Sequence, residues 1–332
     1  IPDDNPMTEE GVLLGRHLFY DGRMSGRTHP DSLISCATCH RQQNYFDVGI
    51  DNPRFVEGVT CGLTGVPTPH TPMPLVNLVF NHNGFLWNGF VDEDNPDEDK
   101  RQLEDLVWMG ITAEHEMFGD TTRVKNLLQT IPEYQQMFQD AFGTPEVTVD
   151  RMGKAVAQFI RSIVSYNSKF DKYLRGEVML TEQELYGYEL FMTEEGADCF
   201  HCHGGAASPL FTTNLYYNNG KDSIFTGEYE DDRDRYHVTN REFDRGSYRA
   251  PTLRNLKYTA PYMHDGRFKT VDEVINFYST EVVNTKYTDV LMHHAASGGV
   301  HLTPMEFNAL KAFLNTLNDD DFITDERFSS PW

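Results

Sequence analysis

Long apolar runs are missing from this 332-residue sequence, and basic residues are few. No stretch approaches the roughly 18 consecutive apolar residues that a transmembrane helix needs, so we expect no membrane span. Lysine and arginine together number 28, against 51 aspartate and glutamate residues, and the formal net charge is -23. A surface of this sign repels nucleic acid and anionic lipid, so we expect neither as a partner. The same charge favours solubility and can steer a basic protein towards the surface.

Cysteine is also scarce, with five residues in the chain, yet four of them belong to two copies of one pattern. Residues 36–40 read Cys-Ala-Thr-Cys-His, and residues 199–203 read Cys-Phe-His-Cys-His. Two cysteines at this spacing, followed directly by a histidine, form the attachment signature of c-type haem. Thiols one helical turn apart can each form a thioether with a haem vinyl group, and the adjacent histidine then reaches the iron.

Zinc half-sites and redox-active cysteine pairs are the alternatives for this pattern. Neither explains a histidine directly after the second cysteine in both copies. We therefore expect two covalently bound haem c groups, attached through Cys36 and Cys39 and through Cys199 and Cys202, with His40 and His203 as iron ligands.

The fifth cysteine, Cys61, is left without a partner, which excludes an internal disulfide. We expect a buried thiol rather than a reactive one. Because c-type haem is attached on the outer side of the bacterial inner membrane, we also expect a periplasmic protein. The chain begins at Ile1 without a basic segment followed by an apolar one, so we expect that an export signal has been removed.

Apolar periodicity predicts a mainly α fold of two cytochrome c-like domains, each binding one covalent haem. The expected helices lie near residues 8–20, 121–142, 150–166, 181–192, 270–279 and 303–317. The expected domains are residues 1–167 and 168–332, with a crossover near 169–176.

Long ordered loops are expected between these helices. Residues 46–77 are rich in glycine, proline and threonine, and residues 206–250 are mostly loop with mixed charge. Residues 92–100 hold six acidic side chains and are expected to form a solvated surface loop, with a calcium site as the alternative.

The segments around the haem patterns resemble the bacterial diheme cytochrome c peroxidase family, which includes the MauG-type enzymes. The matching segments are residues 14–21, 86–89, 116–117, 170–174, 250–255 and 260–266. The resemblance spans essentially the whole chain. It implies peroxide reduction at the N-terminal haem and storage or relay of electrons at the C-terminal haem.

The resemblance implies a catalytic role for Glu116, which falls where the family keeps its distal carboxylate. A peroxidase needs a group that takes a proton from H2O2 and returns one to the departing oxygen. The alternative is an ordinary surface acid. Trp87 matches an indole that conducts electrons between the haems, with a core tryptophan as the alternative. The stretch from Trp87 to Glu116 is longer than the family's usual one, and Trp108 is the competing candidate.

The sixth ligand expected for the second haem is the most informative difference from the ordinary peroxidases of the family. Ordinary peroxidases of the family supply a methionine as its sixth ligand, and the matching position here is Tyr278, on the apolar face of its helix. The resemblance to the MauG type implies an iron ligated by tyrosine, and a packed aromatic is the alternative. A phenolate favours ferric iron, whereas a thioether favours ferrous iron. Substitute ligands are Met263, Met292 and Met305.

A distal histidine, which some family members carry in the loop after the first haem pattern, is not clearly matched. His70 aligns better with a propionate-side or inter-haem position, so we expect an open first haem. His82 and His115 are further candidates near this site.

Calcium between the domains is also implied by the resemblance, through Asn77, Thr259 and Pro261, because carbonyl and amide oxygens suit a hard cation. Arg249 and His264 are implied as hydrogen-bond or propionate partners between the haems, with a structural role as the alternative.

Three functions remain open. The leading hypothesis is a periplasmic diheme peroxidase that reduces H2O2 to water with electrons from a small cytochrome c or cupredoxin. The alternative is a MauG-like enzyme that uses peroxide to oxidise tryptophan or tyrosine side chains of a partner protein. The third is a non-catalytic electron-transfer cytochrome, and a homodimer is compatible with all three.

Overall fold

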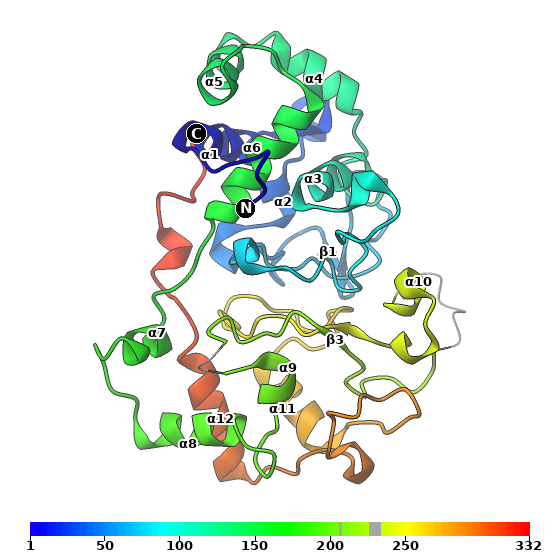
Figure 1. The fold of residues 1–332 in the computed structure, drawn as a ribbon, viewed down its shortest axis with the longest axis vertical. Helices are drawn as coiled ribbons and strands as arrows, with labels where there is room; N and C mark the ends of the chain where they lie inside the picture. Colours follow the sequence, from blue (N-terminus) through cyan, green and yellow to red (C-terminus); the bar gives the residue numbers. More distant parts are fainter. Residues whose placement is uncertain (206–207, 226–233) are drawn as a thin grey trace. The chain divides into compact units, whose positions relative to one another are not determined.

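The computed structural model describes residues 1–205, 208–225 and 234–332 (Figure 1). Part of the predicted loop 206–250 therefore lies outside the described residues. Within these residues helices dominate, and the strands form two short antiparallel pairs. Among the described residues, no helix combines the length and apolarity that crossing a bilayer requires.

The chain forms two compact units. The first comprises residues 1–84, 91–164 and 323–332, and the second comprises residues 85–90 and 165–322. A single division after residue 167 therefore leaves three short segments, residues 85–90, 165–167 and 323–332, in the other unit. One of them, residues 85–90, carries Trp87.

The first unit is built on α1 (Glu9–Tyr20) and α6 (Val149–Ser162), which pack along each other. Thr8 caps α1 by accepting from the Gly11 amide at 3.0 Å. Gly15 allows the close approach, because a Cβ there would collide with the carbonyl of Ala155. The other elements are α2 (Cys36–Cys39), α3 (Leu103–Thr112), α4 (Thr121–Gln129), α5 (Pro132–Phe142), β1 (Phe55–Val56) and β2 (Val59–Thr60).

The second unit repeats this packing with α8 (Glu182–Phe191) and α12 (Pro304–Asn315). Gly187 has the role of Gly15, since a Cβ there would collide with the carbonyl of Ala309. Buried phenylalanines, among them Phe170, fill the core behind this pair. The other elements are α7 (Lys169–Leu174), α9 (Phe200–His203), α10 (Tyr236–Thr239), α11 (Val271–Thr280), β3 (Tyr216–Tyr217) and β4 (Tyr248–Arg249).

Two helix predictions need correction. The helix expected over residues 121–142 is interrupted, and α5 begins at Pro132, because proline lacks an N–H and disfavours helical geometry in the residue before it. Helix α3 was not predicted at all. The acidic loop before it has the expected exposure, and Lys100 pairs with Asp97 there.

A buried ion pair in the first unit gives a stability prediction. Arg161 donates to both carboxylate oxygens of Glu104 at 2.6 and 2.8 Å, and the two side chains are 8% and 7% exposed. Glu104→Gln should lower the free energy of unfolding by about 3 kcal/mol, because the buried guanidinium loses its counter-charge. Urea denaturation of the haem-loaded protein measures this loss. The control is Glu98→Gln at an 86% exposed position, and an equal loss there would contradict the prediction.

Candidate haem sites

The first haem pattern lies on a single helical turn, α2. Thr38 closes the turn by accepting from the Ser35 amide at 3.0 Å, which holds Cys36 and Cys39 one turn apart. The Nδ1 atom of His40 lies 2.8 Å from the carbonyl oxygen of Phe46. A carbonyl only accepts, so this bond assigns the proton to Nδ1 and leaves the Nε2 lone pair for a metal.

The second haem pattern is arranged in the same way. Its turn α9 ends at His203, whose Nδ1 lies 3.1 Å from the carbonyl oxygen of Pro251. Burial lowers the pKa of His203 to about 4, so the ring is neutral at physiological pH. Both histidines are thus in the tautomer that an iron ligand requires.

The cysteines of both patterns are poor candidates for redox-active pairs. Burial raises the pKa of Cys36 and Cys202 to about 12 and that of Cys39 to about 11, and it also raises the pKa of Cys199. Redox-active pairs depend on lowered thiol pKa values. The surroundings therefore fit thiols that are consumed by covalent attachment to haem.

Glu116 lies close to the first haem pattern, although 76 residues separate it from His40 in sequence. The charge of its carboxylate raises the pKa of both Cys36 and Cys39, after the larger effect of burial. Burial also raises the pKa of Glu116 itself to about 7. The side chain still exposes 43% of its surface, so the carboxyl group is only partly withdrawn from water, and His115 Nε2 lies 3.7 Å from its Oε1 atom. A carboxyl with this pKa can both accept and donate a proton near neutral pH.

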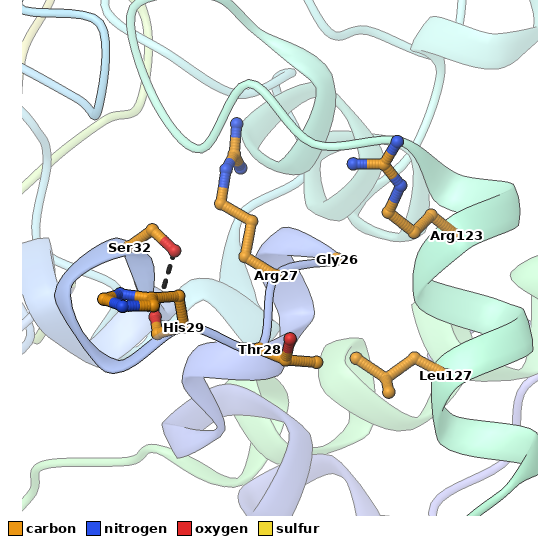
Figure 2. Close-up of a pocket in the computed structure, with 7 residues that line it drawn as sticks. All are labelled: Gly26, Arg27, Thr28, His29, Ser32, Arg123 and Leu127. Carbon is orange, nitrogen blue, oxygen red and sulfur yellow. Dashed lines mark hydrogen bonds between the residues drawn. The ribbon is translucent and has the colours of Figure 1, made fainter.

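Arg27 holds the segment that follows Glu116. Its guanidinium donates to the carbonyl oxygens of Met117 and Phe118, each at 2.9 Å, and to that of Ser25 at 3.1 Å. Arg27 and Arg123 both line a pocket of about 480 Å³, and Figure 2 shows their side chains. The pocket contains no residue of either haem pattern, and Arg27 is the lining residue whose guanidinium binds the carbonyl oxygens of Met117 and Phe118.

Arg27→Gln should slow peroxide reduction about tenfold, because a small displacement of the Glu116 segment misplaces the carboxylate. Haem content should stay unchanged. The matched control is Arg123→Gln, since within the described residues the Arg123 guanidinium forms no hydrogen bond to this segment. Stopped-flow mixing with H2O2 measures the rate, and equal rates in both variants would rule out positioning by Arg27.

Tyr278 lies on α11, close to the second haem pattern. Its hydroxyl accepts from Asn219 Nδ2 at 3.0 Å. Burial raises the pKa of this phenol strongly, and the charges of Cys202 and Cys199 add to the effect. The same amide nitrogen lies 3.9 Å from the sulfur of Met263.

The substitute methionine ligands differ in their surroundings. Met263 and Met292 pack in the same small cluster as Tyr278. Met305 is 67% exposed, so it is unsuited to an axial ligand in a buried haem pocket. Met263 is therefore the strongest competitor of Tyr278.

Trp87 is buried in the second unit. Its ring centroid lies 6.4 Å from that of His264, and the His264 ring stacks on Tyr248 at 3.5 Å. Arg249 fixes this segment, donating from its backbone amide to the Trp87 carbonyl at 2.7 Å and from Nε to the Leu86 carbonyl at 3.1 Å. These residues form a row of aromatic rings held by one arginine.

Trp108, the competing tryptophan, has a packing role in the first unit. It lies on α3, and a Cβ on Gly153 of α6 would approach its Nε1 to 2.7 Å. The indole thus covers the point where α3 meets α6.

The remaining candidates are scattered. Asn77 is buried in the first unit, whereas Thr259 and Pro261 belong to the second, and the calcium site stays a prediction. His70 is half-buried and His82 is exposed. Cys61 is half-buried rather than buried as expected, and its backbone pairs with Pro67.

Residues 9–179 match the family model for di-haem cytochrome c peroxidases. The cytochrome c551 peroxidase of Nitrosomonas europaea is 30% identical over 323 residues, covering 96% of this chain and 82% of the relative. The methylamine utilization protein MauG of Methylophilus methylotrophus is 28% identical over 318 residues, covering 96% and 85%.

A solved structure is also similar over the whole chain. It is a MauG-like protein associated with microbial copper homeostasis, with a TM-score of 0.83 and 31% identity, covering 100% of this chain and 96% of the other. The predicted fold of two mainly helical, cytochrome c-like domains is confirmed by this likeness. The chain therefore belongs to the di-haem cytochrome c peroxidase family, a family of oxidoreductases that carry two haem c groups.

Proposed function

We propose that this chain is a periplasmic enzyme of the MauG type, which uses H2O2 to oxidise aromatic side chains of a partner protein. The observation that carries the proposal is Tyr278, a phenol near Cys199 and Cys202 at the position where an ordinary peroxidase supplies methionine. A hard phenolate ligand disfavours storage of an electron as ferrous iron. The 31% identity to a MauG-like protein supports this choice.

In this proposal, peroxide is reduced at the first haem site, which has His40 and Glu116. His40 would hold a haem iron, which would supply the centre for peroxide reduction. Glu116 accepts the proton that leaves H2O2 and returns it to the departing oxygen. The overall reaction consumes H2O2, two electrons and two protons and yields two waters. In this proposal, the electrons and protons come from the aromatic side chains that are oxidised.

Trp87 is the proposed route for electrons within the second unit. Its indole lies beside His264 and Tyr248, and contacts between aromatic rings shorten the jumps that an electron makes. Arg249 keeps the segment in place.

The second candidate is the peroxidase that takes electrons from a small cytochrome c or cupredoxin. One observation favours it: the Met263 thioether lies beside Tyr278, within 3.9 Å of the amide that holds the phenol. A methionine ligand would make the second haem a store for one electron. The net charge of -23 suits a basic donor protein.

A peroxide titration of the fully ferric protein separates the two candidates. Optical and near-infrared spectra are recorded after each addition, without any reductant. A long-lived spectral change at about one equivalent supports the MauG-type function. If the protein reacts only after one haem has been reduced, and turns over steadily with a reduced small cytochrome, the second candidate is the function.

A further inference from the structure

A group of histidines and carboxylates lies beside the second haem pattern and has no part in the function proposed above. Within residues 1–205, 208–225 and 234–332, one set of three metal-ligating side chains has all its ligand atoms within 4.8 Å of one another. Its members are Glu194, His201 and His293. His201 lies inside the pattern, between the two haem-attaching cysteines.

A fourth residue, Asp198, lies beside both imidazoles. Its Oδ1 atom lies 2.7 Å from His201 Nδ1, and its Oδ2 atom lies 3.2 Å from His293 Nδ1. An ionised carboxylate only accepts, so His201 donates through Nδ1 and keeps the lone pair on Nε2. Asp198 is 5% exposed, which keeps this bridge out of bulk water. Carboxylates that orient histidines in this way are typical of the shell around a bound metal.

The three side chains come from the turn after α8, from α9 and from the loop after α11. His201 Nε2 lies 3.5 Å from Glu194 Oε1, and the rings of His201 and His293 meet edge to face at 4.9 Å. His294 donates from Nε2 to the Glu194 carbonyl at 2.7 Å, which ties the two loops together. The hydrogen bonds of His201 Nδ1 and of His294 Nε2 thus leave His201 Nε2 available as a ligand atom.

An ordinary histidine–carboxylate pair elsewhere in the second unit shows the difference. His237 Nδ1 lies 2.9 Å from Asp234, three residues earlier, as His201 follows Asp198. Among the described residues, that pair is not part of any set of three ligating side chains. Local pairing alone therefore does not produce the convergence at His201.

We propose that Glu194, His201 and His293 bind one divalent transition-metal ion, with Asp198 as the residue that orients His201 and lies beside His293. Two imidazole nitrogens and one carboxylate oxygen suit Zn²⁺ and Cu²⁺, with water completing the coordination. The ion would lie at the edge of the second haem attachment. Its positive charge there should shift the reduction potential of that haem to more positive values.

Zinc binding to the haem-loaded chain tests the site. The protein is treated with EDTA, desalted and titrated with ZnCl2 by isothermal calorimetry, and one high-affinity equivalent is expected. His293→Ala and Glu194→Gln, at 37% and 56% exposed positions, should each weaken binding by about 10–100-fold or more. His237→Ala is the matched control and should bind zinc as the unaltered protein does.

Two results would overturn the proposal. One is the absence of a high-affinity equivalent. The other is equal affinity in His293→Ala and the unaltered protein, which would mean that zinc binds elsewhere on the acidic surface. Anomalous diffraction at the zinc edge distinguishes the ion from the two haem irons and gives its position.

Discussion

Glu116→Gln should slow peroxide reduction by about 10²–10⁴-fold, the range that general acid–base catalysis contributes. Glutamine keeps the size and polarity of the side chain but cannot accept or return a proton. Haem content and the ferric spectrum should stay unchanged, because neither haem pattern is altered. The measurement is stopped-flow mixing of the fully haem-loaded variant with H2O2.

Glu114→Gln is the matched control for this prediction. Glu114 is an exposed acid two residues earlier, and its backbone carbonyl accepts from Thr64 Oγ1 at 2.8 Å. This variant should react at the unaltered rate. If Glu116→Gln also keeps its rate, another group handles the proton, and His115 is the nearest titratable side chain to test.

The pH dependence of the peroxide reaction is an independent test of proton transfer by Glu116. Burial raises the pKa of Glu116 to about 7, and the unprotonated form is the one that accepts a proton from H2O2. The rate should therefore rise with pH through about 7 and be lost at lower pH. The step should disappear in Glu116→Gln and persist in Glu114→Gln.

The sequence predicts those parts of the site that depend on short spacing. Two thiols and a histidine must be near neighbours to hold one haem, so the order of residues alone predicts His40 and His203 as ligands. The helices α8, α11 and α12 are evident for a similar reason. Each has a threonine as its N-cap residue and a glutamate three residues later, as in Thr181 and Glu184. The threonine side chain accepts from the glutamate amide, and the glutamate side chain accepts from the threonine amide.

The other parts of the fold and of the candidate sites depend on contacts between residues far apart in sequence, so the sequence alone does not predict them. The segment with Trp87 belongs to the second unit because its backbone pairs with Arg249, more than 160 residues later. The proposed metal site beside Asp198 brings together residues almost 100 positions apart in sequence. The sequence does not predict helix α3, because this helix follows an acidic loop and its N-cap residue is Gln102, which is not a typical N-cap.

Tyr278→Met should raise the reduction potential of the second haem by an amount on the order of tenths of a volt, because a thioether favours ferrous iron and a phenolate favours ferric iron. Spectroelectrochemical titration measures both haem potentials. Tyr278→Phe removes the hydroxyl and keeps the ring, so it separates ligation from packing. It should also change the ferric spectrum of the second haem.

Tyr217→Phe controls for loss of a hydroxyl near the same haem. Tyr217 lies close to Cys202, and its hydroxyl lies 3.0 Å from that of Thr213, so its removal should leave both potentials unchanged. If Tyr278→Phe also leaves the spectrum and the potentials unchanged, the phenol is a packed aromatic. Met263 is then the ligand to test by Met263→Leu. A thioether-ligated second haem stores an electron, and the function would then be reduction of peroxide with a small donor protein rather than oxidation of a partner.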